Sequence, residues 1–458
     1  MSDHSSSSSR SRNLILCFDG TSSEYSSQNT NVVKFFSLLE KGDYEEQLCY
    51  YQAGVGTYFD PGVVSPLLQW GAKVLDEAFA WYLPTHVMEG YKFLMQNYRP
   101  DDKISIFGFS RGAYTARAVA GMVYKVGLLP KDNDEQIPFA YKLYSRTDDE
   151  GIQLAAGFKS TYCSNHSVKI EFIGVWDTVS SVGVIMTRSL PFTNSNTAVK
   201  TFRHAVAIDE RRTRFRANLF HRPTGTGDMN VGSLPKKLKG RFRWGLSRKK
   251  QREAKVVSAS SSAPKDDKDE PTIDVQEVWF PGCHSDIGGG AVRNDTPHSL
   301  ANITLRWMVR EVIKSQCGIL FRDDALAKLS IPRIEVPSVR IDRTTEAPLP
   351  VLVPAELDEP QMREMDKPDA LAPAHDRLSL GKDGEVLWWV LEVVPMRYSW
   401  QDADGVWHET FEANLGRGRK IEDEHPKFHV TVRERMKDPK LKYKPNARWK
   451  EGTEVYVE

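Results

Sequence analysis

The sequence predicts an α/β fold in which a mainly parallel sheet is covered by helices on both faces. Two observations support this prediction. Short apolar runs of β-type composition alternate with helical patterns over the first 325 residues, and this alternation is typical of parallel strands joined by helices. Four of the apolar runs end just before the polar residues Asp19, Ser110, Asp177 and His284. The carboxyl ends of parallel strands share one sheet edge, where ligands bind.

The expected elements follow one another along the chain. The strand candidates are residues 14–18, 47–52, 104–109, 170–176 and 275–280. The helical patterns cover residues 31–39, 72–98, 111–126, 197–212 and 300–314. Pro84 is expected to bend or divide the second helix, and Asp295 and Pro297 form a start signal for the last. A further β-type run lies at 386–395, and residues 345–385 have the composition of a linker or covering loop.

Composition places the chain among ordinary soluble proteins. Of the 458 residues, 40% are hydrophobic and 27% are charged, and the net charge of +1 gives no overall attraction to nucleic acid or membranes. The five cysteines are scattered, which argues against a disulfide framework and a cysteine-rich zinc site. The N-terminus lacks the apolar core of a signal peptide, and no run of about 18 apolar residues occurs. We therefore expect a cytoplasmic protein without a transmembrane helix.

The domain organisation follows from shifts in composition. Residues 1–12 are expected to be a disordered tail, residues 13–325 an α/β catalytic domain, and residues 326–458 an irregular C-terminal extension that covers or completes that domain. Residues 223–271 interrupt the catalytic domain, and within them residues 236–255 hold ten basic side chains against one acidic side chain. A solvated, disordered insertion is the favoured interpretation. Peripheral contact with an anionic membrane is the second interpretation, and a nuclear-localisation or nucleic-acid patch is the third, so no specific nucleic-acid partner is expected.

The stretch from Gly108 to Gly112 carries the clearest chemical signal. It reads Gly-Phe-Ser-Arg-Gly, follows an apolar strand candidate and precedes a small-residue helix pattern. This order is what a nucleophile elbow requires, because the serine sits on a strained strand-to-helix turn and the glycines let neighbouring backbone pass close to it. The alternative is a small-residue turn that only packs a helix against a sheet.

A serine nucleophile needs a base within reach and an acid that orients the base. Ser110, Asp177 and His284 follow the chain order serine, acid, histidine of the α/β-hydrolase scaffold. Asp177 and His284 each come directly after, or a few residues beyond, a strand candidate, and His284 is followed by a turn with three glycines. These three residues are therefore the predicted catalytic triad.

Other residues compete for these roles. Asp286, two positions after His284, is the main rival acid or a hydrogen-bond partner of the site. Asp209 is placed near a helix end and is expected to pair with Arg211 or Arg212. Four further histidines are weaker candidates for the base: His204, which is predicted to lie in a helix, and His86, His375 and His429, which lack a comparable context.

Acyl transfer also requires donors for the oxyanion that forms in the transition state. The backbone N–H of Arg111 follows the nucleophile, and a second donor is expected from Gly20 or Thr21 in an early strand-to-helix loop. Asp19 in that loop also suggests a haloacid-dehalogenase-type phosphatase, but Cys17 stands where that chemistry needs an aspartate nucleophile. No phosphate-binding Walker loop occurs, and no cofactor or metal is expected.

Five ordered motifs carry a resemblance to a known family. They are Phe18–Thr21, Gly54–Thr57, Gly108–Arg117, Gly174–Val179 and Trp279–Gly289. Together they resemble the catalytic domain of type VI secretion phospholipase effectors of the first lipase class, in a branch similar to fungal proteins. The resemblance implies an α/β-hydrolase fold and ester hydrolysis by a Ser-Asp-His triad, with Ser110, Asp177 and His284 at the matching motif positions.

The sequence thus predicts a serine esterase or lipase that forms an acyl-enzyme and acts on carboxylic esters, with phospholipids as a candidate substrate. The alternative is an inactive hydrolase-fold module that binds anionic lipid or a protein partner, because a fold does not guarantee activity. Amide hydrolysis by the same three residues is a third hypothesis.

Overall fold

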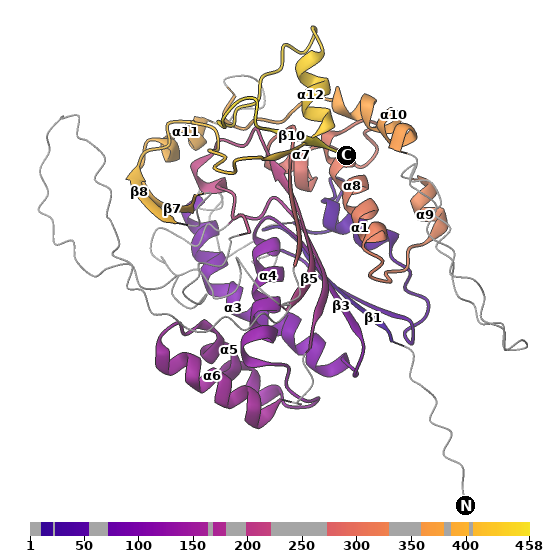
Figure 1. The fold of residues 1–458 in the computed structure, drawn as a ribbon, viewed down its shortest axis with the longest axis vertical. Helices are drawn as coiled ribbons and strands as arrows, with labels where there is room; N and C mark the ends of the chain where they lie inside the picture. The colour runs from indigo at the N-terminus through magenta and orange to yellow at the C-terminus, as the bar shows by residue number, and fades with distance from the viewer. Residues whose placement is uncertain are drawn as a thin grey trace, which may run out of the picture.

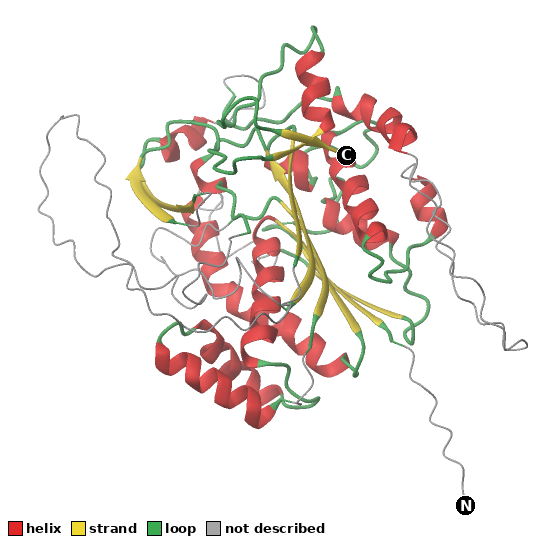
Figure 2. Cartoon of the chain, in the orientation of Figure 1, coloured by secondary structure: helices red, strands yellow, loops and turns green. Residues whose placement is uncertain are grey.

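The central element is a parallel sheet that runs through the molecule (Figures 1 and 2). The computed structural model describes residues 11–21, 23–54, 72–163, 168–179, 198–220, 273–328, 359–379, 386–402 and 406–458. Within these residues the sheet has the order β10-β9-β6-β5-β4-β3-β1-β2, and its strand pairs are parallel. The strands are β1 (Asn13–Phe18), β2 (Gln47–Gln52), β3 (Lys103–Phe109), β4 (Ile170–Trp176), β5 (Val199–Ala207), β6 (Asp274–Phe280), β9 (Lys427–His429) and β10 (Val455–Val457).

Helices cover both faces of this sheet, as predicted. Figure 1 shows α3 (Ala72–Asn97), α4 (Ser110–Val126), α5 (Ile137–Ser145) and α6 (Asp149–Tyr162) on one side. The other side carries α1 (Asn31–Leu38), α7 (His284–Gly288), α8 (Leu300–Lys314), α9 (Asp323–Lys328) and α10 (Glu359–Ala370). Side chains alternate along β1, because Leu14 and Leu16 join one core cluster and Ile15 and Cys17 join the other. The period of two therefore explains why a continuously apolar strand serves two helix layers.

The C-terminal residues extend the sheet. β9 pairs with β6, and β10 pairs with β9. A third core cluster forms there, in which Val206 and Trp279 of the sheet pack against Ile421, Phe428 and other residues of the C-terminal region. This region also contains α11 (Val386–Glu392), α12 (Val430–Lys437) and an antiparallel pair, β7 (Met396–Gln401) and β8 (Trp407–Glu412). The boundary at residue 325 stays a prediction.

Several expected elements differ from the structure. Residues 197–212 do not form a helix, because residues 199–207 are β5, in the middle of the sheet. Residues 386–392, expected to be β-type, form α11. α10 lies inside the segment that was expected to be a linker. Ser299, and not Asp295 or Pro297, caps α8, since its hydroxyl accepts the N–H of Ala301.

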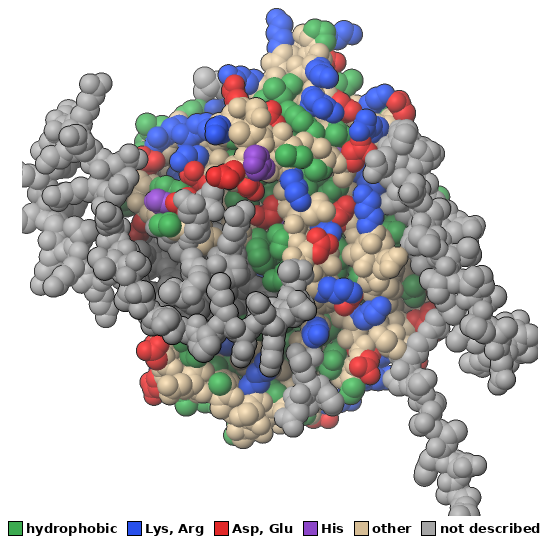
Figure 3. Space-filling model, viewed as in Figure 1, with side chains coloured by type: hydrophobic (Ala, Val, Ile, Leu, Met, Phe, Trp, Pro, Cys, Tyr) green, Lys and Arg blue, Asp and Glu red, His purple; other side chains and the backbone are tan. Residues whose placement is uncertain are grey.

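The remaining expectations concern the predicted tail, the basic insertion, the surface charge and transmembrane helices. Residues 1–10 of the predicted tail at 1–12, and the basic residues 236–255, lie outside the described residues. Within the predicted tail, Arg12 is buried and forms an ion pair with Asp102 at 2.7 Å. On the face in Figure 3, basic and acidic side chains are interspersed, with Lys and Arg most frequent over the C-terminal elements at the top. Among the described residues, no helix has both the length and the apolar character needed to cross a bilayer.

Candidate active site

Ser110 stands at a sharp turn between β3 and α4. Its φ of 58° is in the left-handed region, which is costly for a residue with a side chain. A Cβ on Gly108 would lie 2.6 Å from the carbonyl oxygen of Gly112, and a Cβ on Gly112 would lie 2.3 Å from that of Asp19. Both flanking positions therefore need glycine because backbone passes too close for a side chain. This is the local geometry of a nucleophile elbow.

The structure brings Ser110, His284 and Asp177 into direct contact. His284 is the first residue of α7, a few residues after β6, and its Nε2 lies 2.8 Å from the Ser110 Oγ. Its Nδ1 lies 2.5 Å from Oδ2 of Asp177, which follows β4 with a φ of 37°. Since an ionised carboxylate can only accept, Nδ1–H donates to Asp177 and Nε2 accepts from the Ser110 hydroxyl.

Two aromatic rings hold the imidazole of His284. The centroids of the Phe109 and Phe215 rings each lie 4.7 Å from that of His284. Gly288 makes room for Phe109, since a Cβ at Gly288 would lie 1.9 Å from that ring. Gly289 and Gly290 have φ values of 80° and 84°. The three-glycine turn thus combines a close approach of the Phe109 ring with unusual backbone angles.

The charges around the triad are buried and compensated. Burial opposes ionisation of Asp177, but the charge of Arg419 and the hydrogen bond from His284 outweigh it and hold the pKa of Asp177 below its usual range. Burial lowers the pKa of His284, against the raising effect of Asp177. A neutral imidazole at neutral pH is the form that can accept a proton from the serine hydroxyl.

Sequence reasoning missed two charged residues of the site. Glu210 accepts the backbone N–H of His284 at 3.1 Å and forms a buried ion pair with Arg212. Arg419, from the C-terminal region, contacts both carboxylate oxygens of Asp177. Neither residue belongs to a motif with catalytic spacing, and Arg419 lies 242 positions from its partner along the chain.

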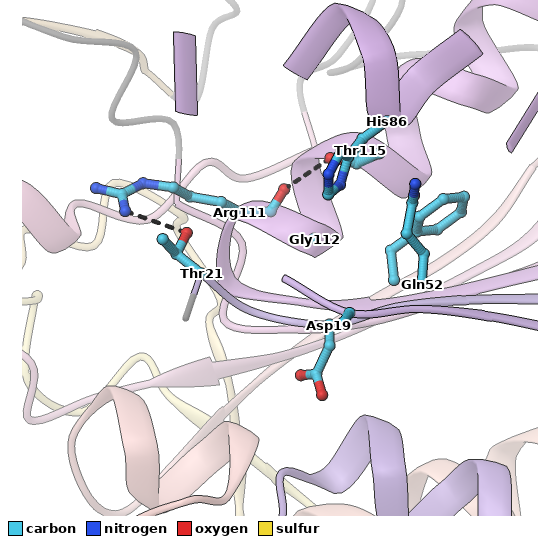
Figure 4. A pocket seen from close by; sticks show the side chains of 9 residues that line it. Asp19, Thr21, Gln52, His86, Arg111, Gly112 and Thr115 are labelled. Carbon is cyan, nitrogen blue, oxygen red and sulfur yellow. Dashed lines mark hydrogen bonds between the residues drawn. The ribbon is translucent and has the colours of Figure 1, made fainter. Parts of the chain in front are cut away.

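The predicted oxyanion donors lie at the elbow, with one correction. The Gly20 N–H donates to the carboxylate of Asp19 at 2.7 Å, so it is not directed at the serine. Thr21 remains the candidate in that loop, and its hydroxyl accepts a hydrogen bond from the Arg111 side chain at 3.1 Å (Figure 4). The Arg111 amide lies in the first turn of α4, directly after Ser110. A Cβ on Gly20 would lie 3.4 Å from the Ser110 Cβ, so this loop borders the nucleophile.

Asp19 and Asp286, the secondary candidates, have other partners. In Figure 4 the Asp19 carboxylate points away from Thr21 and Arg111. It accepts the hydroxyl groups of Thr30 and Tyr51, both at 2.8 Å, and burial raises its pKa. Asp286 accepts the Cys283 N–H at 2.9 Å and contacts Nδ1 of His375 at 2.7 Å. Both carboxylates thus anchor loops near the triad.

The rival residues are also accounted for. His204 lies in β5, where its ring contacts Glu277 at 2.6 Å and accepts the Thr178 N–H at 3.0 Å. Asp209 follows a strand and not a helix, and it binds the Gly282 N–H and the Tyr443 hydroxyl instead of Arg211 or Arg212. Among the residues that the structure describes, no group of three or more His, Cys, Asp or Glu side chains is placed to hold a metal ion.

Comparisons with known proteins identify similar proteins over the part of the chain that contains the candidate site. A family model described as the catalytic domain of T6SS phospholipase effectors, Tle1-like, matches residues 12–311. The uncharacterized protein YEL023C of Saccharomyces cerevisiae is 29% identical over 560 residues, covering 96% of this chain and 81% of that protein. A crystal structure of an uncharacterized Pseudomonas aeruginosa protein is 18% identical with a TM-score of 0.34, covering 70% of this chain and 49% of that one. The Tle1 effector bound to the VgrG spike of the Type 6 secretion system is 17% identical with a TM-score of 0.31, covering 63% of this chain and 52% of the other. The match thus spans about half the length of these two solved chains.

Proposed function

The chain belongs to the family of Tle1-like phospholipase effector catalytic domains, and we propose that it is a serine hydrolase that cleaves carboxylic ester bonds of lipids. The hydrogen-bonded series Ser110 Oγ, His284 Nε2, His284 Nδ1 and Asp177 Oδ2 is the observation that supports this proposal most directly. Family membership supports the lipid substrate class, and this contact geometry supports the mechanism.

In the first half of the reaction, Ser110 Oγ attacks the carbonyl carbon of the ester while its proton passes to His284 Nε2. The carbonyl electron pair moves onto oxygen, and the resulting oxyanion accepts hydrogen bonds from the backbone N–H groups of Arg111 and Thr21. When the carbon–oxygen ester bond breaks, His284 returns the proton to the departing alcohol. The acyl group then remains on Ser110.

In the second half, water attacks the acyl-enzyme. His284 takes a proton from the water, and collapse of the second tetrahedral intermediate releases the carboxylic acid and restores the Ser110 hydroxyl. Throughout, Asp177 holds the imidazole in one tautomer and stabilises the imidazolium that forms. No cofactor takes part in this proposal.

A fluorophosphonate probe tests the proposed mechanism. Wild-type protein should be labelled, and Ser110→Ala should abolish both labelling and ester hydrolysis. Ser105→Ala is a matched control, because Ser105 is a buried serine in β3 outside the triad. Labelling that survives Ser110→Ala would move the nucleophile elsewhere, and no labelling of wild type alongside binding of lipid vesicles would favour the inactive binding module.

The substrate class needs a separate measurement. Hydrolysis of short-chain esters, long-chain esters and phospholipids should be compared side by side, with phospholipid expected among the substrates. Contact of residues 236–255 with anionic membranes stays a proposal, which deletion of 223–271 tests in a vesicle-binding assay. Unchanged affinity for anionic vesicles would refute that contact.

A further inference from the structure

We propose that Arg419 is a positioning residue of the active site, which fixes the carboxylate of Asp177 and makes the C-terminal region part of the catalytic machinery. This inference rests on the proposed Ser-His-Asp mechanism. It concerns a residue outside the stretch of 12–311 that the family model covers.

The contact between Arg419 and Asp177 is close and buried. Nη1 of Arg419 lies 2.6 Å from Oδ1 of Asp177, and Nη2 lies 2.9 Å from Oδ2. The two side chains are 6% and 0% exposed. Two parallel N–H···O contacts between a guanidinium and a carboxylate restrict rotation of both groups, which a single contact would not do.

The guanidinium is itself held by the sheet and by a neighbouring turn. Nη1 also donates to the Ala207 carbonyl at the end of β5 at 2.9 Å, and Nη2 donates to the Phe215 carbonyl. The backbone of Arg419 accepts the Arg448 N–H at 2.8 Å. Gly418 lets the backbone next to Arg419 pass close to that of Asn446, since a Cβ on Gly418 would lie 1.8 Å from the Asn446 carbonyl oxygen. Arg419 is thus fixed before substrate arrives.

This arrangement assigns each oxygen of Asp177. Oδ1 accepts from the Ala207 N–H at 2.9 Å and from Arg419, and Oδ2 accepts from Arg419 and from His284. Without the guanidinium, one backbone N–H alone would orient the carboxylate against His284. Rotation of the carboxylate would then move the imidazole relative to Ser110, and misplacement of a reacting group by about 1 Å costs roughly 100-fold in rate.

Arg419 also sets the charge that His284 experiences. The charged groups around His284 are Asp177 with Arg419, and Glu210 with Arg212, which form two compensated pairs. Asp286, two residues after His284 in α7, contacts His375. Removing the positive charge of Arg419 leaves Asp177 free to favour the imidazolium. The pKa of His284 should then rise, because an opposite charge nearby favours the charged form.

The test uses Arg419→Met in the full chain, which removes the charge and keeps much of the side-chain volume. We expect kcat on a short-chain ester to fall about 100-fold with a smaller change in KM. The acidic limb of the kcat/KM profile should move to higher pH by about one unit, since His284 must be neutral to act. Arg419→Ala instead leaves the space of the guanidinium open, and added methylguanidine should restore part of the rate of that variant.

Two further variants separate positioning from folding. Arg435→Met removes another buried arginine of the C-terminal region, which binds the carbonyls of Ala370 and Ala372, and it should leave the pH limb unchanged. Arg419→Lys keeps the charge but loses the two-point contact of the guanidinium with the Asp177 carboxylate. The acidic limb of the kcat/KM profile should therefore stay in place while kcat falls about tenfold. This variant decides the question if Arg419→Met does not fold.

The outcomes distinguish this inference from the proposed function. An unshifted acidic limb in Arg419→Met together with no methylguanidine rescue of Arg419→Ala, or an Arg419→Lys enzyme with full kcat, would overturn the role of Arg419 alone. A wild-type protein that neither hydrolyses esters nor reacts with a fluorophosphonate would overturn the serine mechanism itself.

Discussion

The substitution Gly112→Ala tests the elbow on which the proposed mechanism depends. Gly112 lies in the first turn of α4, and in a helix alanine is ordinarily favoured over glycine by about 1 kcal/mol. Here a Cβ would lie 2.3 Å from the Asp19 carbonyl oxygen and 2.4 Å from that of Phe18. These oxygens belong to the backbone of β1 and the residue after it, which are buried in the sheet. No flexible side chain can therefore relieve the contact.

The size of the effect follows from this contact. Cβ atoms essentially never come closer than 3.0 Å to such a neighbour, so α4 and β1 must separate by about 0.7 Å. Overpacking of a core costs about 1–3 kcal/mol, and a rigid neighbour places this case in the upper half of that range. After subtraction of the helix preference, Gly112→Ala should lower the free energy of unfolding by about 1–2 kcal/mol. Because α4 carries Ser110, kcat/KM should fall by roughly 100-fold.

Urea denaturation and ester hydrolysis measure these two effects, and the same substitution elsewhere supplies the control. Gly157 lies exposed in α6, and a Cβ there would meet nothing within 4 Å. Gly157→Ala should therefore raise the free energy of unfolding by about 0.5–1 kcal/mol and leave activity unchanged. If Gly112→Ala is as stable as Gly157→Ala and as active as wild type, the packing of the elbow has been misjudged.

Three further predictions concern the triad and its surroundings. Asp177→Asn should lower kcat/KM by about 10³–10⁴-fold. It should also lower the free energy of unfolding by about 3–5 kcal/mol, because Arg419 stays buried without its carboxylate partner. A variant as stable as wild type in urea titration would contradict this. Gly288→Ala should displace the Phe109 ring and slow fluorophosphonate labelling at least tenfold. Adding Phe109→Leu should restore part of the labelling rate, and a double variant no faster than the single one would refute the contact. Burial lowers the pKa of His429 to about 3 from 6.5, so as the pH falls the unfolded chain takes up this proton before the folded protein does. The contribution of the neutral imidazole to stability, fully present above pH 6.5, is therefore lost between pH 6.5 and 3. His429→Gln should flatten the fall of unfolding free energy across that range by up to about 1.4 kcal/mol per pH unit, and an identical slope in both proteins would argue against a buried neutral imidazole.

The sequence predicted those parts of the fold in which local pattern and final environment agree. Strands such as β1 and β4 are nearly continuous apolar runs, because helices cover both of their faces. The prediction of a helix in place of β5 is wrong, because Arg203 and His204 break the apolar pattern in the middle of this strand. Both side chains are buried, where Arg203 pairs with Glu311 and His204 contacts Glu277. Carboxylates distant in the sequence make those polar positions compatible with a central strand, and no local pattern contains that information.

The same distinction applies to α11, where composition pointed to a strand. The aromatic residues that suggested it contact other parts of the chain: the Trp388 ring lies 5.5 Å from that of Phe215, and Trp389 Nε1 donates to the Leu378 carbonyl at 3.2 Å. Aromatic residues favour strands only weakly by themselves, so tertiary contacts decide the conformation of a seven-residue segment. For the candidate site, position after a strand, together with the Gly-x-Ser-x-Gly spacing and the chain order serine, acid, histidine, nominates Ser110, Asp177 and His284.

Arg419 could not be nominated in that way, and the reason lies in how the C-terminal region is built. Its contribution consists of short pieces, two three-residue strands and an eight-residue helix, whose apolar residues show no extended period. These pieces are stable only when they pack against Val206 of β5 and Trp279 of β6, the strand whose outer edge pairs with β9. The packing that buries this edge also delivers the guanidinium of Arg419 to Asp177. In this chain the completion of the sheet and the compensation of the buried carboxylate are therefore one structural event, so a mutation that loosens the third core cluster should affect the site even at a distance from it.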